Sequence, residues 1–216
     1  MRKGQQTRTA ILEQALAIAS QAGLAGLTIG TLAERSGLSK SGLFAHFGSK
    51  EGLQLAVIQG VRQLYSDLVF QPAIQQQPGL ARLRAVVENW LKWTASAKLP
   101  GGCIMTAAAY EFDDWPGPVR ELVSQSLREL RKTLARSVRL AMEAGQLQQD
   151  TDADQLAFEI FSLYLGAQLD ARLFGDPRAY ERALVAFENL LERHGSGETP
   201  ARAGDRPARA AANGAH

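Results

Sequence analysis

Hydrophobic residues recur every three or four positions along most of the first 194 residues, and glycine, proline and short polar runs separate these periodic stretches. This spacing places apolar side chains along one face of an α-helix. We therefore expect an all-α protein of about nine helices, with a small N-terminal unit and a larger C-terminal helical domain.

The pattern also divides the chain. Residues 1–7 are basic and carry no hydrophobic period, so we expect a flexible arm there. Residues 8–48 are expected to form three short helices, and residues 49–70 a connecting helix. The run 71–79, with glutamines between prolines, marks a boundary. Residues 71–194 form the larger domain, and residues 195–216, rich in Gly, Ala, Pro and Arg, are expected to be disordered.

Residues 28–50 hold two short helical patterns separated by Ser36, Gly37 and Leu38. A turn of this length makes two helices cross at a steep angle, and glycine accepts the positive φ that such a turn needs. Ala33, Gly37 and Leu43 have the spacing of a helix-turn-helix, a motif that lays its second helix in the DNA major groove.

Two lysines follow the candidate N-caps of this region. Ser39 is expected to cap the second helix and Ser49 the next one, and Lys40 and Lys50 come directly after them. A cation there opposes the helix dipole at a cost of roughly 0.3–1 kcal/mol. A phosphate in front of the helix would remove this cost. The alternative is that both lysines simply point into water.

The segment 11–53 resembles the DNA-binding domain of TetR/AcrR-type transcriptional regulators. The matching residues are Ile11, Leu12, Ala15, Gly23, Thr28, Leu32, Ala33, Gly37, Leu38, Ser39, Gly42, Leu43, Phe44, His46, Phe47, Ser49, Lys50, Glu51 and Leu53. The resemblance implies a homodimer that binds a near-palindromic operator. Phe44 stands where the family usually has a tyrosine whose hydroxyl contacts a phosphate, so this chain keeps only the ring.

The residues and the resemblance together predict a set of DNA contacts. Lys40 and Ser41 are candidates for base or phosphate contact, whereas the others would position the DNA backbone. The full set is Thr28, Ser39, Lys40, Ser41, Phe44, His46 and Lys50. For His46, a packed or backbone-contacting ring is favoured over a metal or pH-sensing role.

Charge distribution and cysteine content limit the class of binding partner and the kind of fold. The net charge is only +2, but residues 1–60 carry six basic and three acidic side chains, whereas residues 61–194 carry fifteen and seventeen. The positive excess therefore surrounds the helix-turn-helix, as DNA binding requires. One cysteine excludes a disulfide framework. No signal peptide or membrane-length apolar run is visible, so we expect a cytoplasmic protein.

The larger domain suggests an apolar effector pocket. Residues 101–121 resemble the ligand domain of one subgroup of these regulators, which implies the architecture but no particular effector. Taken singly, each candidate is favoured as a core residue over a ligand contact. The pocket candidates are Trp90, Trp93, Met105, Tyr110, Phe112, Trp115, Phe161 and Tyr164. Cys103 is either a redox-sensitive thiol at a helix start or a small buried hydrophobe, and the second is favoured.

The last two helical patterns have broad apolar faces, which can pair with the same faces of a second copy. The alternative is that they only cover the core of one chain. The predicted interface residues are Leu156, Ile160, Leu163, Ala167, Tyr180, Leu184, Phe187 and Leu191.

These observations favour a sequence-specific DNA-binding regulator, a ligand-responsive repressor with an apolar or aromatic small-molecule effector and no cofactor or metal. One alternative is a nucleoid-type protein that binds DNA without sequence preference, which the modest charge disfavours. The other is a small-molecule enzyme. No catalytic triad spacing, metal-ligand cluster, P-loop or dinucleotide glycine pattern supports it, so we expect no enzyme activity.

Overall fold

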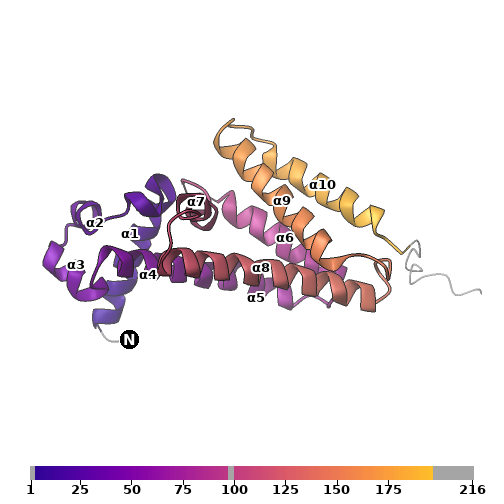
Figure 1. Ribbon diagram of the computed structural model, residues 1–216, viewed down its shortest axis with the longest axis horizontal. Helices are drawn as coiled ribbons and strands as arrows, with labels where there is room; N and C mark the ends of the chain where they lie inside the picture. Colours follow the sequence, from indigo (N-terminus) through magenta and orange to yellow (C-terminus); the bar gives the residue numbers. More distant parts are fainter. Residues whose placement is uncertain (1–2, 97–99, 197–216) are drawn as a thin grey trace, which may run out of the picture.

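The computed structural model describes residues 3–96 and 100–196, which form an elongated all-helical molecule (Figure 1). The helices are α1 (Lys3–Gly26), α2 (Ile29–Ser36), α3 (Lys40–Phe47), α4 (Lys50–Tyr65), a π-helical turn η1 (Ser66–Phe70), α5 (Gln71–Ile74), α6 (Leu80–Thr94), α7 (Ile104–Glu111), α8 (Pro118–Glu143), α9 (Ala153–Arg172) and α10 (Ala179–Arg193). Because α4, η1 and α5 follow one another without a break, the described residues form nine helical rods. The predicted all-α fold is confirmed.

Helices α1, α2 and α3 gather at one end of the molecule (Figure 1). Gly37 adopts φ 68° between α2 and α3, as the predicted turn requires. The predicted N-caps are also present: Ser39 Oγ accepts a hydrogen bond from the Gly42 amide (3.1 Å) and Ser49 Oγ from the Gly52 amide (2.9 Å). Leu32 and Leu43 are fully buried between the helices. The expected helix-turn-helix is therefore confirmed.

Helix α1 begins earlier than the sequence suggested. It starts at Lys3, so residues 3–7 are helical rather than a flexible arm, while residues 1–2 lie outside the described part. Gln5 and Gln6 are good helix formers and can extend a helix that has already formed. At the other end, Gly23 interrupts the helical geometry with φ 73°, where the sequence predicted the helix to stop.

The connecting rod is longer than expected, because it continues through η1 and α5 to Ile74 instead of stopping at Phe70. Pro72 lies in the first turn of α5, has no N–H to donate and would crowd the preceding turn of a regular α-helix. The wider π-turn ahead of it relieves this conflict. Asn89 Nδ2 of α6 donates to the Val69 carbonyl in that turn (3.3 Å).

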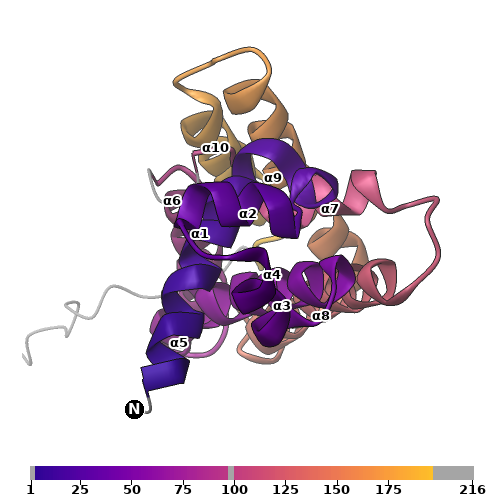
Figure 2. The ribbon, with the colours of Figure 1, turned by 90° about the vertical axis from the view of Figure 1, so that its left-hand side faces the viewer.

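The C-terminal domain is built around α8, which runs along α4, and around the antiparallel pair α9 and α10 (Figure 1). Seen from the helix-turn-helix end, α7 lies beside α1 (Figure 2). Arg84 of α6 and Glu188 of α10 form a two-pronged ion pair with distances of 2.9–3.0 Å. Within the described ranges, no helix combines the length and apolar character of a membrane span. Most of the predicted disordered tail, residues 197–216, lies outside the described part.

Candidate functional site

The outward face of α3 is exposed at the tip of the molecule. Leu43 and Phe47 point into the core, whereas Lys40, Ser41, Phe44 and Ala45 are exposed. The Phe44 side chain has half of its surface (51%) in contact with solvent, which is unusual for a large apolar residue. The helix therefore presents one cation, one hydroxyl and an apolar patch.

Three of the predicted DNA-contacting side chains also have local roles as helix caps or cap neighbours. Thr28 and Thr31 form a reciprocal capping box at the start of α2, with both backbone-to-hydroxyl distances at 3.0 Å. Ser39 caps α3, and its hydroxyl lies 3.2 Å from that of Ser41. These bonds fix the N-terminal ends of both helices of the motif.

Lys50 and Gln54 tie α4 to the end of α1. Lys50 Nζ donates to the Ala25 carbonyl (2.7 Å), and Gln54 Nε2 donates to the Leu24 carbonyl (2.7 Å). Lys50 therefore does not extend freely into solvent, although an ammonium has further protons to donate. His46 is half-buried with its ring 6.3 Å from that of Phe47, a packed position.

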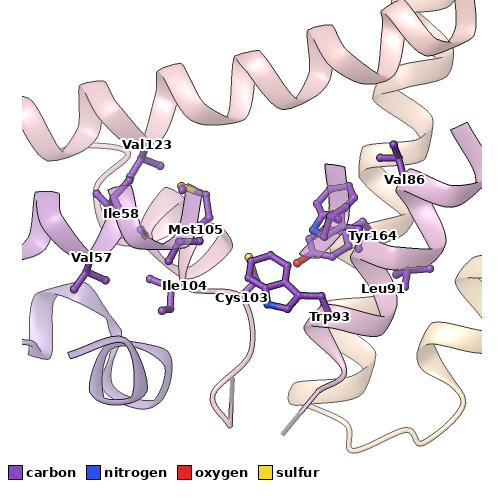
Figure 3. Close-up of a cluster of buried hydrophobic side chains, with 14 of the residues drawn as sticks. Val57, Ile58, Val86, Leu91, Trp93, Cys103, Ile104, Met105, Val123 and Tyr164 are labelled. Carbon is purple, nitrogen blue, oxygen red and sulfur yellow. The ribbon is translucent and has the colours of Figure 1, made fainter. Parts of the chain in front are cut away.

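A cavity of about 230 Å³ lies between the connecting rod, α6, α7, α8 and α9. Four of the eight predicted pocket residues line it: Trp90, Trp93, Met105 and Phe161. Figure 3 shows Trp93, Cys103 and Met105 within the buried cluster around this space. The prediction missed the wall formed by α4, η1 and α8, which is lined by Val61, Arg62, Tyr65, Ser66, Phe70, Ser126, Leu127, Glu129, Leu130 and Thr133.

The other four predicted pocket residues lie elsewhere. Tyr110 and Trp115 are 66% and 70% exposed, so the structure does not bring them to the cavity. Phe112 is partly buried at the end of α7 but does not line the cavity. Tyr164 is buried behind the cavity wall, stacked on Trp90 with ring centroids 3.7 Å apart. Aromatic residue type alone did not distinguish these positions, because Tyr110 lies on an exposed part of α7, Trp115 lies on the exposed loop after it, and Tyr164 belongs to the core.

The cavity lining is mostly apolar and carries balanced charge. Among its described residues, Glu129 is the one carboxylate and Arg62 the one cation, and the two form an ion pair at 2.7 Å. The Tyr65 hydroxyl is buried and has no hydrogen-bond partner among the described residues. Burial raises the pKa of Tyr65 well above its ordinary value, so this hydroxyl stays protonated. An unpaired buried donor of this kind favours a ligand with an acceptor atom.

Helix α7 connects the cavity to the N-terminal domain. Cys103, Met105 and Thr106 line the cavity at one end of this segment. At its other end, Glu111 Oε2 accepts a hydrogen bond from the Ala25 amide (2.8 Å). The Ala25 carbonyl is the acceptor of Lys50, so this residue joins α7 and α4 through its backbone.

The faces of α9 and α10 differ from the predicted interface. Five of the eight predicted residues, Leu156, Ile160, Ala167, Phe187 and Leu191, are buried against the same chain, and Leu163, Tyr180 and Leu184 are partly buried. These five side chains cover the core of their own chain, and the interface itself stays a prediction. Other large apolar side chains of these two helices are exposed: Phe158, Leu169, Leu173 and Val185 are 48–69% exposed.

An exposed helix-turn-helix at one end and an apolar cavity within a helical domain define a DNA-binding regulator with a separate effector domain. The family model for bacterial regulatory proteins of the tetR family matches residues 11–57. The model for the tetracyclin repressor-like C-terminal domain matches residues 79–187, half of the chain. The chain belongs to the TetR family and is a DNA-binding transcriptional regulator.

Solved structures share the fold. A TetR transcriptional regulator from Chloroflexus aurantiacus is 28% identical, with 90% of this chain and 98% of that chain covered and a TM-score of 0.81. A TetR-family regulator from Cytophaga hutchinsonii is 21% identical, with coverages of 92% and 99% and a TM-score of 0.78. A regulator from Saccharomonospora viridis, solved in complex with choline, is 21% identical, with coverages of 87% and 96% and a TM-score of 0.74. No curated protein matches the chain.

Proposed function

We propose that this regulator is a homodimeric repressor that leaves its operator when a small, uncharged, apolar molecule fills the cavity. One observation carries the proposal: the cavity is lined by Val61, Arg62 and Tyr65 of the same rod that begins at Lys50 beside the helix-turn-helix. A ligand that favours one position of this rod would therefore shift the position of α3. It can do so only through its different affinity for the two states.

The DNA side of the proposal uses the two helix starts. In a dimer, two α3 helices would enter successive major grooves of a near-palindromic operator, roughly 34–36 Å apart. Lys40 and Ser41 would contact bases or phosphates, Thr28, Ser39, His46 and Lys50 would hold the DNA backbone, and the Phe44 ring would face the DNA. The outward faces of α9 and α10, which carry the exposed apolar side chains, are the surface proposed for pairing the two copies.

The chemistry of the lining favours an uncharged effector. The rings of Tyr65, Trp90 and Trp93 line the cavity, and the Tyr65 ring meets the other two edge-on with centroid distances of 6.2 and 6.3 Å. The one carboxylate is already paired with Arg62. A quaternary ammonium such as choline would therefore find no unpaired carboxylate among the described lining residues to balance its charge. A compact aromatic molecule with an acceptor for Tyr65 fits these features better.

The test is a mobility-shift selection with the full-length protein and a pool of random duplexes, with the DNA flanking its own gene as a second probe. Dimeric binding predicts a selected sequence with two-fold symmetry. Lys50→Glu should weaken binding to all sequences, whereas Lys40→Ala or Ser41→Ala should also change the selected sequence. Binding that shows no preference within the pool would contradict the proposal and favour a non-specific DNA-binding protein.

The effector is tested separately by thermal shift with uncharged aromatic compounds, with choline as the charged comparison. A compound that raises the melting temperature should also release the selected duplex, because both effects follow from preferential binding to one state. Stabilisation without release would contradict the proposed coupling between cavity and DNA.

A further inference from the structure

The outward face of α3 has an uncommon composition for a helix expected to recognise bases. Its sequence, KSGLFAHF, contains no Asn, Gln, Arg, Asp or Glu. Leu43 and Phe47 are buried, and His46 is half-buried. Lys40, Ser41, Phe44 and Ala45 therefore supply the exposed side chains of this helix. Two of these four are apolar, and the larger one, Phe44, has no hydroxyl with which to bind a phosphate.

The major groove offers few features that such side chains can recognise. Adenine is recognised by paired hydrogen bonds from Asn or Gln, and cytosine by a carboxylate acceptor, but α3 carries none of these groups. A lysine can donate to guanine, which leaves a role for Lys40. The 5-methyl group of thymine is the apolar group that the bases display there, and it is the natural partner of Phe and Ala side chains.

We infer that Phe44, with Ala45 beside it, recognises thymine methyl groups in the operator and sets part of the sequence preference of this regulator. The inference rests on the proposed use of α3 as the recognition helix. Phe44 follows Lys40 by four residues, so the two side chains lie on one face about 6 Å apart along the helix axis. This spacing corresponds to roughly two base-pair steps at about 3.4 Å each. A thymine therefore lies about two base pairs from the base or phosphate that Lys40 contacts.

The exposure of the Phe44 ring argues against a purely structural role for this residue. A core residue would be covered by its own chain, as the neighbouring Leu43 is, with no exposed surface. Phe44 by contrast is 51% exposed. Removing the Phe44 ring should therefore change binding more than folding. Packing the exposed half of the Phe44 ring against a thymine methyl group buries apolar surface on both partners, which is favourable.

The test replaces thymine by deoxyuridine, which removes the 5-methyl group and keeps every base-pairing atom. The probe is the duplex selected by the full-length protein from a random pool, and affinity is measured by fluorescence anisotropy. At the thymine facing Phe44, replacement should weaken binding about fourfold for each methyl lost, and more than tenfold when both half-sites are changed. Replacement at thymines outside the two half-sites should have no effect.

The second arm assigns the effect to Phe44. In Phe44→Ala, the thymine-to-deoxyuridine affinity ratio should fall to about one, whereas Ser41→Ala should keep the wild-type ratio even if its overall affinity drops. Thermal melting confirms that each variant is folded, and Phe44→Leu, which retains apolar bulk, should keep part of the ratio.

Three results would count against the inference. A selected operator without thymine in its half-sites would overturn it, as would equal affinity for the thymine and deoxyuridine duplexes. If the thymine-to-deoxyuridine affinity ratio stayed unchanged in Phe44→Ala, recognition of the methyl group could not be assigned to the Phe44 ring. If the protein bound no duplex at all, the proposed function would fail as well, so the two failures are distinguishable.

Discussion

Glu111 is expected to hold the effector domain against the helix-turn-helix domain, and its removal gives a measurable cost. The carboxylate accepts the Ala25 amide at 2.8 Å and is half-buried. A hydrogen bond to a charged group contributes about 1.5–3 kcal/mol when well shielded. Partial exposure reduces this, so we expect Glu111→Ala to lower the free energy of unfolding by about 1–1.5 kcal/mol. For a chain of this size, that is a fall in melting temperature of about 2–6 °C.

Gly23 offers an independent check of the same contact. A Cβ at this position would lie 1.9 Å from Glu111 Oε1, and the residue has φ 73°. Gly23→Ala should therefore cost the left-handed backbone strain and also displace the carboxylate. In the Glu111→Ala background only the strain remains. The two substitutions should then be non-additive, with an interaction energy of about 0.5–1.5 kcal/mol.

The assay is thermal unfolding of the four proteins of this double-mutant cycle, together with hydrogen exchange at the Ala25 amide. Exchange at Ala25 should accelerate in Glu111→Ala, and Glu111→Gln should lie between that variant and wild type because it keeps a neutral acceptor. Glu13→Ala, an exposed position on α1, serves as the control and should change stability by less than about 0.5 kcal/mol. Additive free energies, or unchanged exchange at Ala25, would refute the role of Glu111.

Three further predictions concern the cavity, the dimer and pH. Leu130→Trp, which places a larger side chain in the cavity wall, should abolish effector-induced thermal shifts; retained shifts would show that effectors bind elsewhere. Leu169→Glu, at a residue that is 52% exposed, should produce a folded monomer in size-exclusion chromatography, whereas Trp115→Glu, at an exposed residue on the loop before α8, should remain dimeric. Burial raises the pKa of Tyr164 above its ordinary value of 10, so its contribution to stability is complete below about pH 10 and is lost as pH rises further. Denaturant unfolding above pH 10 should show a slope of up to about 1.4 kcal/mol per pH unit for this residue, and the slope should shrink in Tyr164→Phe.

The local chemistry of the N-terminal domain could be predicted from the sequence because single residues determine it. Ser39 and Ser49 form caps, and Gly23 and Gly37 adopt positive φ where the pattern placed breaks. The start of α1 could not be predicted, since residues 3–7 lack an apolar stripe and their helical state depends on extension from the helix that follows.

The effector cavity and the exposed face of α9 and α10 were harder to predict for a different reason. Helical period shows that a residue lies on an apolar face but not which neighbour covers that face. Leu156 and Phe158 are both apolar residues of α9, yet the first is buried and the second is half exposed. Tyr65 was missed as a cavity residue because its place depends on how the rod, α6 and α8 pack together.

The backbone of Ala25 carries two tethers, its amide to Glu111 and its carbonyl to Lys50. A hybrid regulator that joins this helix-turn-helix domain to the effector domain of another protein would therefore need a carboxylate at the position equivalent to Glu111. A hybrid that keeps Lys50 but lacks that carboxylate would keep one of the two hydrogen bonds to Ala25, and the effector domain would be less tightly coupled to the DNA-binding domain.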